Sequence, residues 1–128
     1  MEGVSVLIFV ESRYKVNRKR IKATIARTLK QQNITSAAEV SVAIVGDRKM
    51  RILNKKYRNL DKTTNVLSFS QAEGESIPTP ISDKMRLGDI VLSYPMVIND
   101  ASRDDMMVDD KVDELVAHGL LHLLGVHH

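Results

Sequence analysis

The sequence contains no cysteine and no tryptophan, and aromatic residues make up only 4% of its 128 residues. Without cysteine, the chain has no disulfide, no disulfide-linked partner, no thiolate metal ligand and no thiol nucleophile. No apolar run approaches the roughly 18 residues that a membrane-spanning helix needs, and residues 1–11 lack the basic segment and cleavage site of a signal peptide. We therefore expect a soluble, cytoplasmic protein without membrane contact, in which any metal is held by His, Asp or Glu.

The remaining composition is that of a globular protein, with 43% hydrophobic and 27% charged residues. The length suits one core, and no repeat or shift in composition divides the chain, which predicts a single domain over residues 1–128. The net charge of +3 conceals an asymmetry: residues 1–62 carry 15 Lys and Arg against 5 Asp and Glu, whereas residues 63–128 carry 4 against 11. The basic half predicts a surface for a polyanion, although exposed basic helix faces are common in proteins that bind none.

Apolar periodicity and turn residues predict eight elements. We expect strands at 4–10, 40–45, 65–70 and 88–93, and helices at 17–32, 47–57, 95–103 and 108–124. Asn17 and Asp47 are predicted N-caps, and Pro95 suits the first turn of its helix. Residues 71–86 form the longest segment without a predicted element and are a candidate lid. This order predicts the α+β class, with a mixed four-stranded sheet flanked by helices.

The predicted helix at 17–32 is amphipathic and strongly basic, and a second basic group lies near residue 55. The three tyrosines are scattered along the sequence and predict no platform on which bases stack, so we expect affinity for any nucleic acid to be electrostatic and dependent on salt. The candidate phosphate contacts are Arg18, Lys19, Arg20, Lys22, Arg27, Lys30, Lys55 and Lys56.

All four histidines lie within residues 118–128. Because positions i and i+4 share one face of a helix, His118 and His122 can direct their imidazoles to one point, as in the HxxxH helix of zincins. Gly125 can end the helix in a left-handed conformation and bring His127 or His128 back as a third ligand. Three histidines and a water are typical of a catalytic zinc site. The surrounding helix is rich in leucine, so we expect both histidines to be at least partly buried and to need partners, which a metal would supply. The alternative is a satisfied histidine pair of the core without metal.

The pattern H-x-x-x-H-x-x-G-x-x-H also occurs in metzincin proteases, but Gly119 stands where these enzymes need a glutamate base. His-Gly-Leu-Leu-His-Leu-Leu-Gly from His118 instead resembles the signature of the YbeY family of metal-dependent endoribonucleases. Two further stretches, Leu53 to Phe69 and Leu87 to Ser93, resemble that family's arginine segment with its following strand and its Gly-Asp-Ile strand. The resemblance therefore covers most of residues 50–128.

The resemblance implies a single-strand endoribonuclease that acts in ribosomal RNA maturation, including 3′-end processing of 16S rRNA, and in ribosome quality control. It further implies one zinc ion, or another divalent metal, held by His118, His122 and His128, with Arg58 as the functional arginine. Ribosomal RNA and the small ribosomal subunit or its proteins are the implied partners. A planar guanidinium suits this role because it can bind a phosphate in bidentate fashion and offset charge in the transition state.

Two positions depart from the family pattern and leave alternatives open. Asn65 and His127 each stand in place of an aspartate, and His127 or the terminal carboxylate is an alternative to His128 as the third ligand. No general base is evident, and the candidates are His127, Asp89, Asp109, Asp110, Asp113 and Glu114. A zincin-like peptidase that binds peptide along the strand at 66–70, and a non-catalytic ribosome-assembly factor with a structural metal, are the alternative functions.

Overall fold

The computed structural model describes residues 3–11, 13–71 and 85–126 and contains the eight predicted elements in the predicted order. Asn17 caps the first helix, with its side chain accepting from the backbone N–H of Arg20, and Pro95 lies in the first turn of the third. The α+β class and the four-stranded sheet are thus confirmed. The bounds are β1 Val4–Val10, α1 Arg18–Gln31, β2 Ala38–Val45, α2 Asp47–Arg58, β3 Val66–Ser70, β4 Met85–Ser93, α3 Tyr94–Arg103 and α4 Val108–Leu123.

The sheet has the order β1-β2-β4-β3 and is mixed. β1 and β4 both pair with β2 in parallel, whereas β3 pairs with β4 antiparallel and forms an edge. Gly88 in β4 has a φ of +139°, and a Cβ at this position would lie 2.1 Å from the carbonyl oxygen of Phe69. Only glycine therefore allows β3 to approach β4 at this point.

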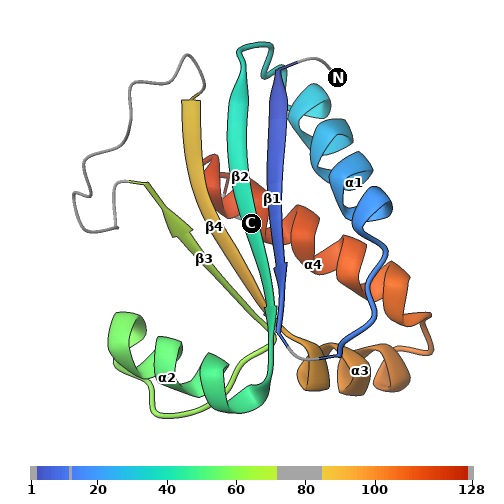
Figure 1. The fold of residues 1–128 in the computed structure, drawn as a ribbon, viewed down its shortest axis with the longest axis vertical. Coiled ribbons are helices and arrows are strands. Elements are labelled where there is room, and N and C mark those ends of the chain that lie inside the picture. The colour runs from blue at the N-terminus through green and yellow to red at the C-terminus, as the bar shows by residue number, and fades with distance from the viewer. Residues whose placement is uncertain (1–2, 12, 72–84, 127–128) are drawn as a thin grey trace.

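Helices α1 and α4 cover one face of the sheet, with α1 beside β1 and α4 running diagonally behind the strands (Figure 1), where it contacts β3 and β4. Side chains from alternate strand positions fill this layer together with apolar residues of the two helices, and most are fully buried. Of the described helices, α2 alone packs on the other face, where its Met50 forms a small second cluster with Val45, Leu67 and Val91. Leu7 and Phe9 of β1 remain 45% and 64% exposed.

Two details differ from the sequence predictions. The N-cap of α2 is Gly46 rather than Asp47, because Asp47 is the first helical residue and its carboxylate accepts instead from Ser93 Oγ and Thr63 Oγ1. Strand β4 begins at Met85, so the last two residues of the predicted loop at 71–86 belong to the sheet. The rest of the candidate lid, residues 72–84, lies outside the described residues. Within the described part of the chain, no helix is long and apolar enough to cross a membrane.

Candidate metal and RNA cleft

Helix α4 brings His118 and His122 together one turn apart, as the i, i+4 spacing predicts. Their Nε2 atoms are 3.1 Å from each other and their ring centroids 4.6 Å apart. Two nitrogen ligands with metal bonds of about 2.05 Å around one tetrahedral ion lie roughly 3.3 Å apart. The spacing of the two Nε2 atoms therefore suits two ligands of a single zinc ion.

The prediction that both histidines are at least partly buried was wrong, because both side chains are exposed. The buried surface of α4 is formed by residues such as Leu115, Val116 and Leu120, which face the sheet and α1. The histidines lie outside this packed surface and face a cleft. An exposed imidazole pair satisfies its hydrogen bonds with water, so the leucine-rich surroundings do not themselves require a metal.

The third predicted ligand, His128, and its alternative, His127, both lie outside the described residues. Gly125 does adopt the predicted left-handed conformation, with a φ of +79°. The N–H groups of Gly125 and Val126 donate to the carbonyls of His122 and Leu121, which closes the helix with the two hydrogen bonds of a Schellman motif. Among residues 3–11, 13–71 and 85–126, no group of three His, Asp or Glu side chains is arranged to hold a metal.

Arg58, the last residue of α2, lines the same cleft as the histidine pair. This cleft has a volume of about 290 Å³ and is formed by Arg58, Val66, Leu67, Ser68, His118, Gly119 and His122. The Arg58 guanidinium donates to the carbonyl oxygen of Ser68 at 2.9 Å and lies over the ring of Phe69, 4.9 Å from its centroid. These contacts with β3 fix a positive charge opposite the two imidazoles.

Gly119 has a packing role that the sequence pattern did not reveal. It is buried where α4 crosses the sheet, and a Cβ there would lie 2.9 Å from Cγ2 of Ile90. A glutamate at this position would force α4 away from β4. The close approach of helix and sheet therefore excludes the base that a metzincin mechanism requires.

The described candidates for a general base lie away from the cleft. Asp89 alternates along β4 with Ile90, which faces α4, so Asp89 lies on the opposite face of the sheet. Asp110 and Asp113 form ion pairs with Arg20 at 2.5 and 2.7 Å. The two remaining acidic candidates also lie in the first half of α4, where Asp109 occupies the first turn and Glu114 pairs with Lys111.

Asn65 also points away from the cleft. Its side-chain nitrogen donates to Oδ2 of Asp100 in α3 at 2.9 Å, and Arg103 donates to Oδ1 of the same buried carboxylate. An aspartate at position 65 would place two carboxylates within hydrogen-bond distance of each other, which is unfavourable unless one of them is protonated. Asparagine at position 65 therefore avoids repulsion with the negative charge of Asp100.

The predicted phosphate contacts divide into two groups. The cations of α1 lie on the helix that packs toward β1, three strand spacings or about 14 Å from the edge formed by β3. Among them Arg20 is held by Asp110 and Asp113, so that its charge is offset. Lys55 and Lys56, by contrast, are exposed in the last turn of α2 beside Arg58.

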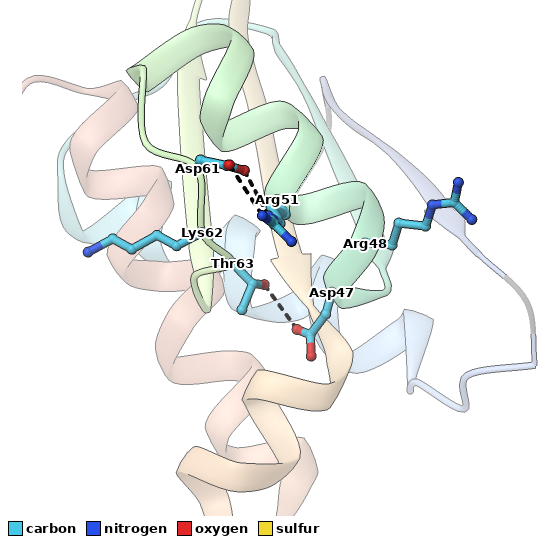
Figure 2. A pocket seen from close by; sticks show the side chains of 6 residues that line it. All are labelled: Asp47, Arg48, Arg51, Asp61, Lys62 and Thr63. Atoms are coloured by element: carbon cyan, nitrogen blue, oxygen red, sulfur yellow. Dashed lines mark hydrogen bonds and ion pairs between the residues drawn. The ribbon is translucent and has the colours of Figure 1, made fainter.

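A second cleft lies at the start of α2, where Arg48 and Lys62 extend into solvent (Figure 2). It has a volume of about 480 Å³ and is lined by Asp47, Arg48, Arg51, Asp61, Lys62 and Thr63. Arg51 donates from Nε and Nη2 to both oxygens of Asp61, and this pair lowers the pKa of the Asp61 carboxyl. Because the charges of Arg51 and Asp61 cancel, the cleft is less positive than its three cations suggest.

The fold and the cleft define an α+β protein whose C-terminal helix presents two histidines beside the edge of a mixed sheet, opposite an arginine. The family model described as "Endoribonuclease YbeY" matches residues 8–128. The chain therefore belongs to the YbeY family, as its motifs indicated.

Individual relatives agree with this assignment. The chain is 38% identical over 110 residues to the Endoribonuclease YbeY of Desulforamulus reducens, and this alignment covers 86% of the chain and 72% of the relative. It is 32% identical over 133 residues to the Endoribonuclease YbeY of Dehalococcoides mccartyi, covering 98% and 83%. The solution structure of a Thermotoga maritima protein superimposes with a TM-score of 0.57 at 23% identity, covering 96% of this chain and 74% of that one, which supports the fold.

Proposed function

We propose that this protein is a metal-dependent endoribonuclease that cleaves single-stranded RNA during ribosomal RNA maturation, including 3′-end processing of 16S rRNA, and in ribosome quality control. Its place of action is the cytoplasm, and its partners are ribosomal RNA and the small ribosomal subunit or its proteins. Membership of a family described as endoribonucleases supports this assignment. The observation that carries it is the cleft in which Arg58 of α2 lies opposite His118 and His122 of α4.

In this proposal His118, His122 and His128 hold one zinc ion. The exposed Nε2 atoms of the first two are spaced for a shared ion, and imidazole is a common zinc ligand. When bound, a divalent ion supplies a Lewis acid that polarises a phosphoryl oxygen and lowers the pKa of water. His118 and His122 would hold this group in the cleft that Val66, Leu67 and Ser68 of β3 also line.

Arg58 binds the scissile phosphate and offsets the negative charge that grows on it in the transition state. Its hydrogen bond to Ser68 and its contact with Phe69 hold the guanidinium in one orientation before RNA binds. A donor that is already oriented needs little reorganisation during the reaction, which is the basis of electrostatic catalysis. Lys55 and Lys56 supply further positive charge for the neighbouring phosphates.

The peptidase alternative is disfavoured by Gly119. β3 is an edge strand of the described sheet, but its Ser68 carbonyl accepts from Arg58, and the contact between Gly119 and Ile90 leaves no room for a glutamate base next to His118. The cleft that Arg58 shares with two exposed histidines favours a catalytic site over a non-catalytic assembly factor. The nuclease, the peptidase and the assembly factor predict different results for the purified protein.

The test uses untagged protein, its measured zinc content, a ribosomal RNA precursor and casein. We expect wild-type protein to bind zinc, to melt at a higher temperature with zinc than with chelator, and to cleave the RNA. His118→Ala should abolish the zinc-dependent rise in melting temperature and the cleavage. Arg58→Ala should retain zinc and lower the cleavage rate about 10²- to 10³-fold.

Arg48→Ala is the matched control, since it removes an exposed arginine from the opposite end of the same helix. It should leave the cleavage rate nearly unchanged. RNA cleavage that survives His118→Ala would refute the metal mechanism. Casein cleavage that is lost in His118→Ala would favour the peptidase, and zinc binding without cleavage of either substrate would favour the assembly factor.

A further inference from the structure

A small pocket lies on the face of the sheet opposite α4, between the strands and α2. It has a volume of about 240 Å³ and is lined by Ser41, Ala43, Leu53, Tyr57, Phe69, Asp89 and Val91. Ser41, Asp89 and Phe69 are direct neighbours across β2, β4 and β3, and Ala43 and Val91 form the next row. The volume is below the roughly 300–1,000 Å³ of pockets for drug-sized ligands, so it suits one planar ring system.

Two aromatic side chains form one wall of this pocket. The rings of Tyr57 and Phe69 have centroids 4.9 Å apart at an interplanar angle of 56°. Tyr57 is 41% exposed, so its ring offers a face to a ligand. The expectation from sequence that no stacking platform exists rested on the low aromatic content, the absence of tryptophan and the scattered tyrosines, but the fold brings Tyr57 against a phenylalanine. Aromatic faces of this kind bind unpaired bases.

The pocket adjoins the cleft of the proposed active site. Phe69 lines the pocket, and the guanidinium of Arg58, which lines the cleft, lies over the Phe69 ring. Lys56 adds a second cation at the rim, with Nζ 5.1 Å from the centroid of the Tyr57 ring. A strand of RNA whose phosphate is bound by Arg58 can therefore place an adjacent base in the pocket. The two cations beside the aromatic wall favour a polyanion over a neutral peptide.

The polar side of the pocket is a carboxylate. Asp89 is exposed and accepts a hydrogen bond from the Ser41 hydroxyl, while its second oxygen has no protein partner within the described part of the chain. A carboxylate accepts hydrogen bonds but donates none, so it favours base edges with amino groups. Adenine, cytosine and guanine have such an edge. Uracil presents a single N–H between two carbonyl oxygens, which the carboxylate repels.

We propose that this pocket binds one unpaired base next to the scissile phosphate, stacked against Tyr57 and selected by Asp89 against uracil. The inference rests on the proposed function, since it assigns a binding subsite for the same RNA substrate. Tyr57 and Asp89 thus position and select the substrate without contacting the reacting phosphate. A protein segment is the competing occupant of the pocket, and RNA binding distinguishes the two.

The test measures the affinity of short fluorescent homopolymers of adenosine and uridine by anisotropy in the presence of chelator, so that cleavage does not interfere. Wild-type protein should prefer adenosine to uridine at least about 5-fold. Tyr57→Ala should weaken adenosine binding about 5- to 150-fold, whereas Tyr57→Phe keeps the ring and should bind normally. Asp89→Asn should reduce the preference for adenosine while retaining most of the affinity.

Phe9→Ala is the matched control, because Phe9 is a 64% exposed aromatic residue of β1 that the pocket does not include. It should leave both affinities unchanged. Unaltered adenosine binding by Tyr57→Ala would overturn the proposal and leave the pocket to a protein partner. The proposed function can fail separately. If the protein binds adenosine through Tyr57 but cleaves no RNA, the base pocket is supported and the nuclease assignment is refuted. If the protein cleaves RNA but Tyr57→Ala binds adenosine normally, only the nuclease assignment is supported.

Discussion

On one face of the sheet, α1 and α4 enclose a layer of apolar side chains that is almost completely buried, whereas on the other face α2 covers only part of the strands. The ion pairs that link α1 to α4 and α3 to α4 also belong to the first region. Arg58, the pocket lined by Tyr57 and Phe69 and the cleft at the start of α2 belong to the second. The comparison indicates that most of the stability resides in one layer, while exposed charged and aromatic groups gather at α2 and β3, opposite the histidines of α4.

The largest effect is expected from a comparison of two isoleucines, one in the buried layer and one on the exposed side of α2. Ile25 of α1 is 0% exposed, whereas Ile52 of α2 is 53% exposed. Ile25→Ala should lower the free energy of unfolding by about 2–5 kcal/mol because it leaves a cavity, and Ile52→Ala should change it by less than about 0.5 kcal/mol. Denaturant unfolding of both variants measures the difference. Equal losses would show that α2 contributes as much to the core as α1 does.

An intermediate effect is expected at Gly119, where the buried layer meets the cleft. Gly119→Ala places a Cβ against Cγ2 of Ile90, and we expect a loss of about 1–3 kcal/mol in the free energy of unfolding. The loss should shrink when the same substitution is made in an Ile90→Ala background, because the clashing methyl group is then absent. A double-mutant cycle by thermal unfolding measures this coupling. Purely additive losses would contradict a direct contact between helix and sheet at this position.

The smallest effect concerns the ion pairs at the corner of α3 and α4. Hydrogen bonds from Arg103 and then Lys111 lower the pKa of the Asp104 carboxyl well below its ordinary value. A carboxyl with a lower pKa in the folded state stabilises the protein above its unfolded pKa and loses this contribution as the pH falls toward the folded pKa. Stability should therefore decline below about pH 4, and less steeply in Asp104→Asn.

Asp105→Asn is the control for this measurement, because Asp105 is an exposed neighbour and asparagine tolerates its positive φ of 54°. Its acid unfolding curve should match that of the wild type. If the stability of Asp104→Asn falls with pH as steeply as that of the wild type, the ion pairs of Asp104 do not contribute to the pH dependence of stability.

Periodicity in the sequence was sufficient to predict the elements and the HxxxH pair, because both depend on residues close together in the chain. The partners of Arg58 were not predictable in this way. Ser68 and Phe69 reach it only because β3 pairs antiparallel with β4 and returns beside the end of α2. The Tyr57–Phe69 wall arises from the same arrangement.

The burial of the histidines was mispredicted for a related reason. Counting leucines around α4 does not reveal which of them face a neighbouring element, and Leu121, Leu123 and Leu124 are only partly buried. The predicted phosphate contacts of α1 stay a prediction, but one of these cations has partners that the sequence did not indicate. Arg20 is directed instead to Asp110 and Asp113, which lie 90 or more positions away in the sequence.

The two sides of the cleft differ in how firmly they are anchored. Helix α4 buries six of its residues, including Val116 and Leu120, whereas α2 buries only Met50 and Asn54. Amide hydrogens of α4 should consequently exchange with solvent only when the whole domain unfolds, and those of α2 through smaller local openings. Arg58 therefore lies at the end of the helix that opens more readily and depends for its position on Ser68 and Phe69, whereas His118 and His122 lie on the helix that opens last.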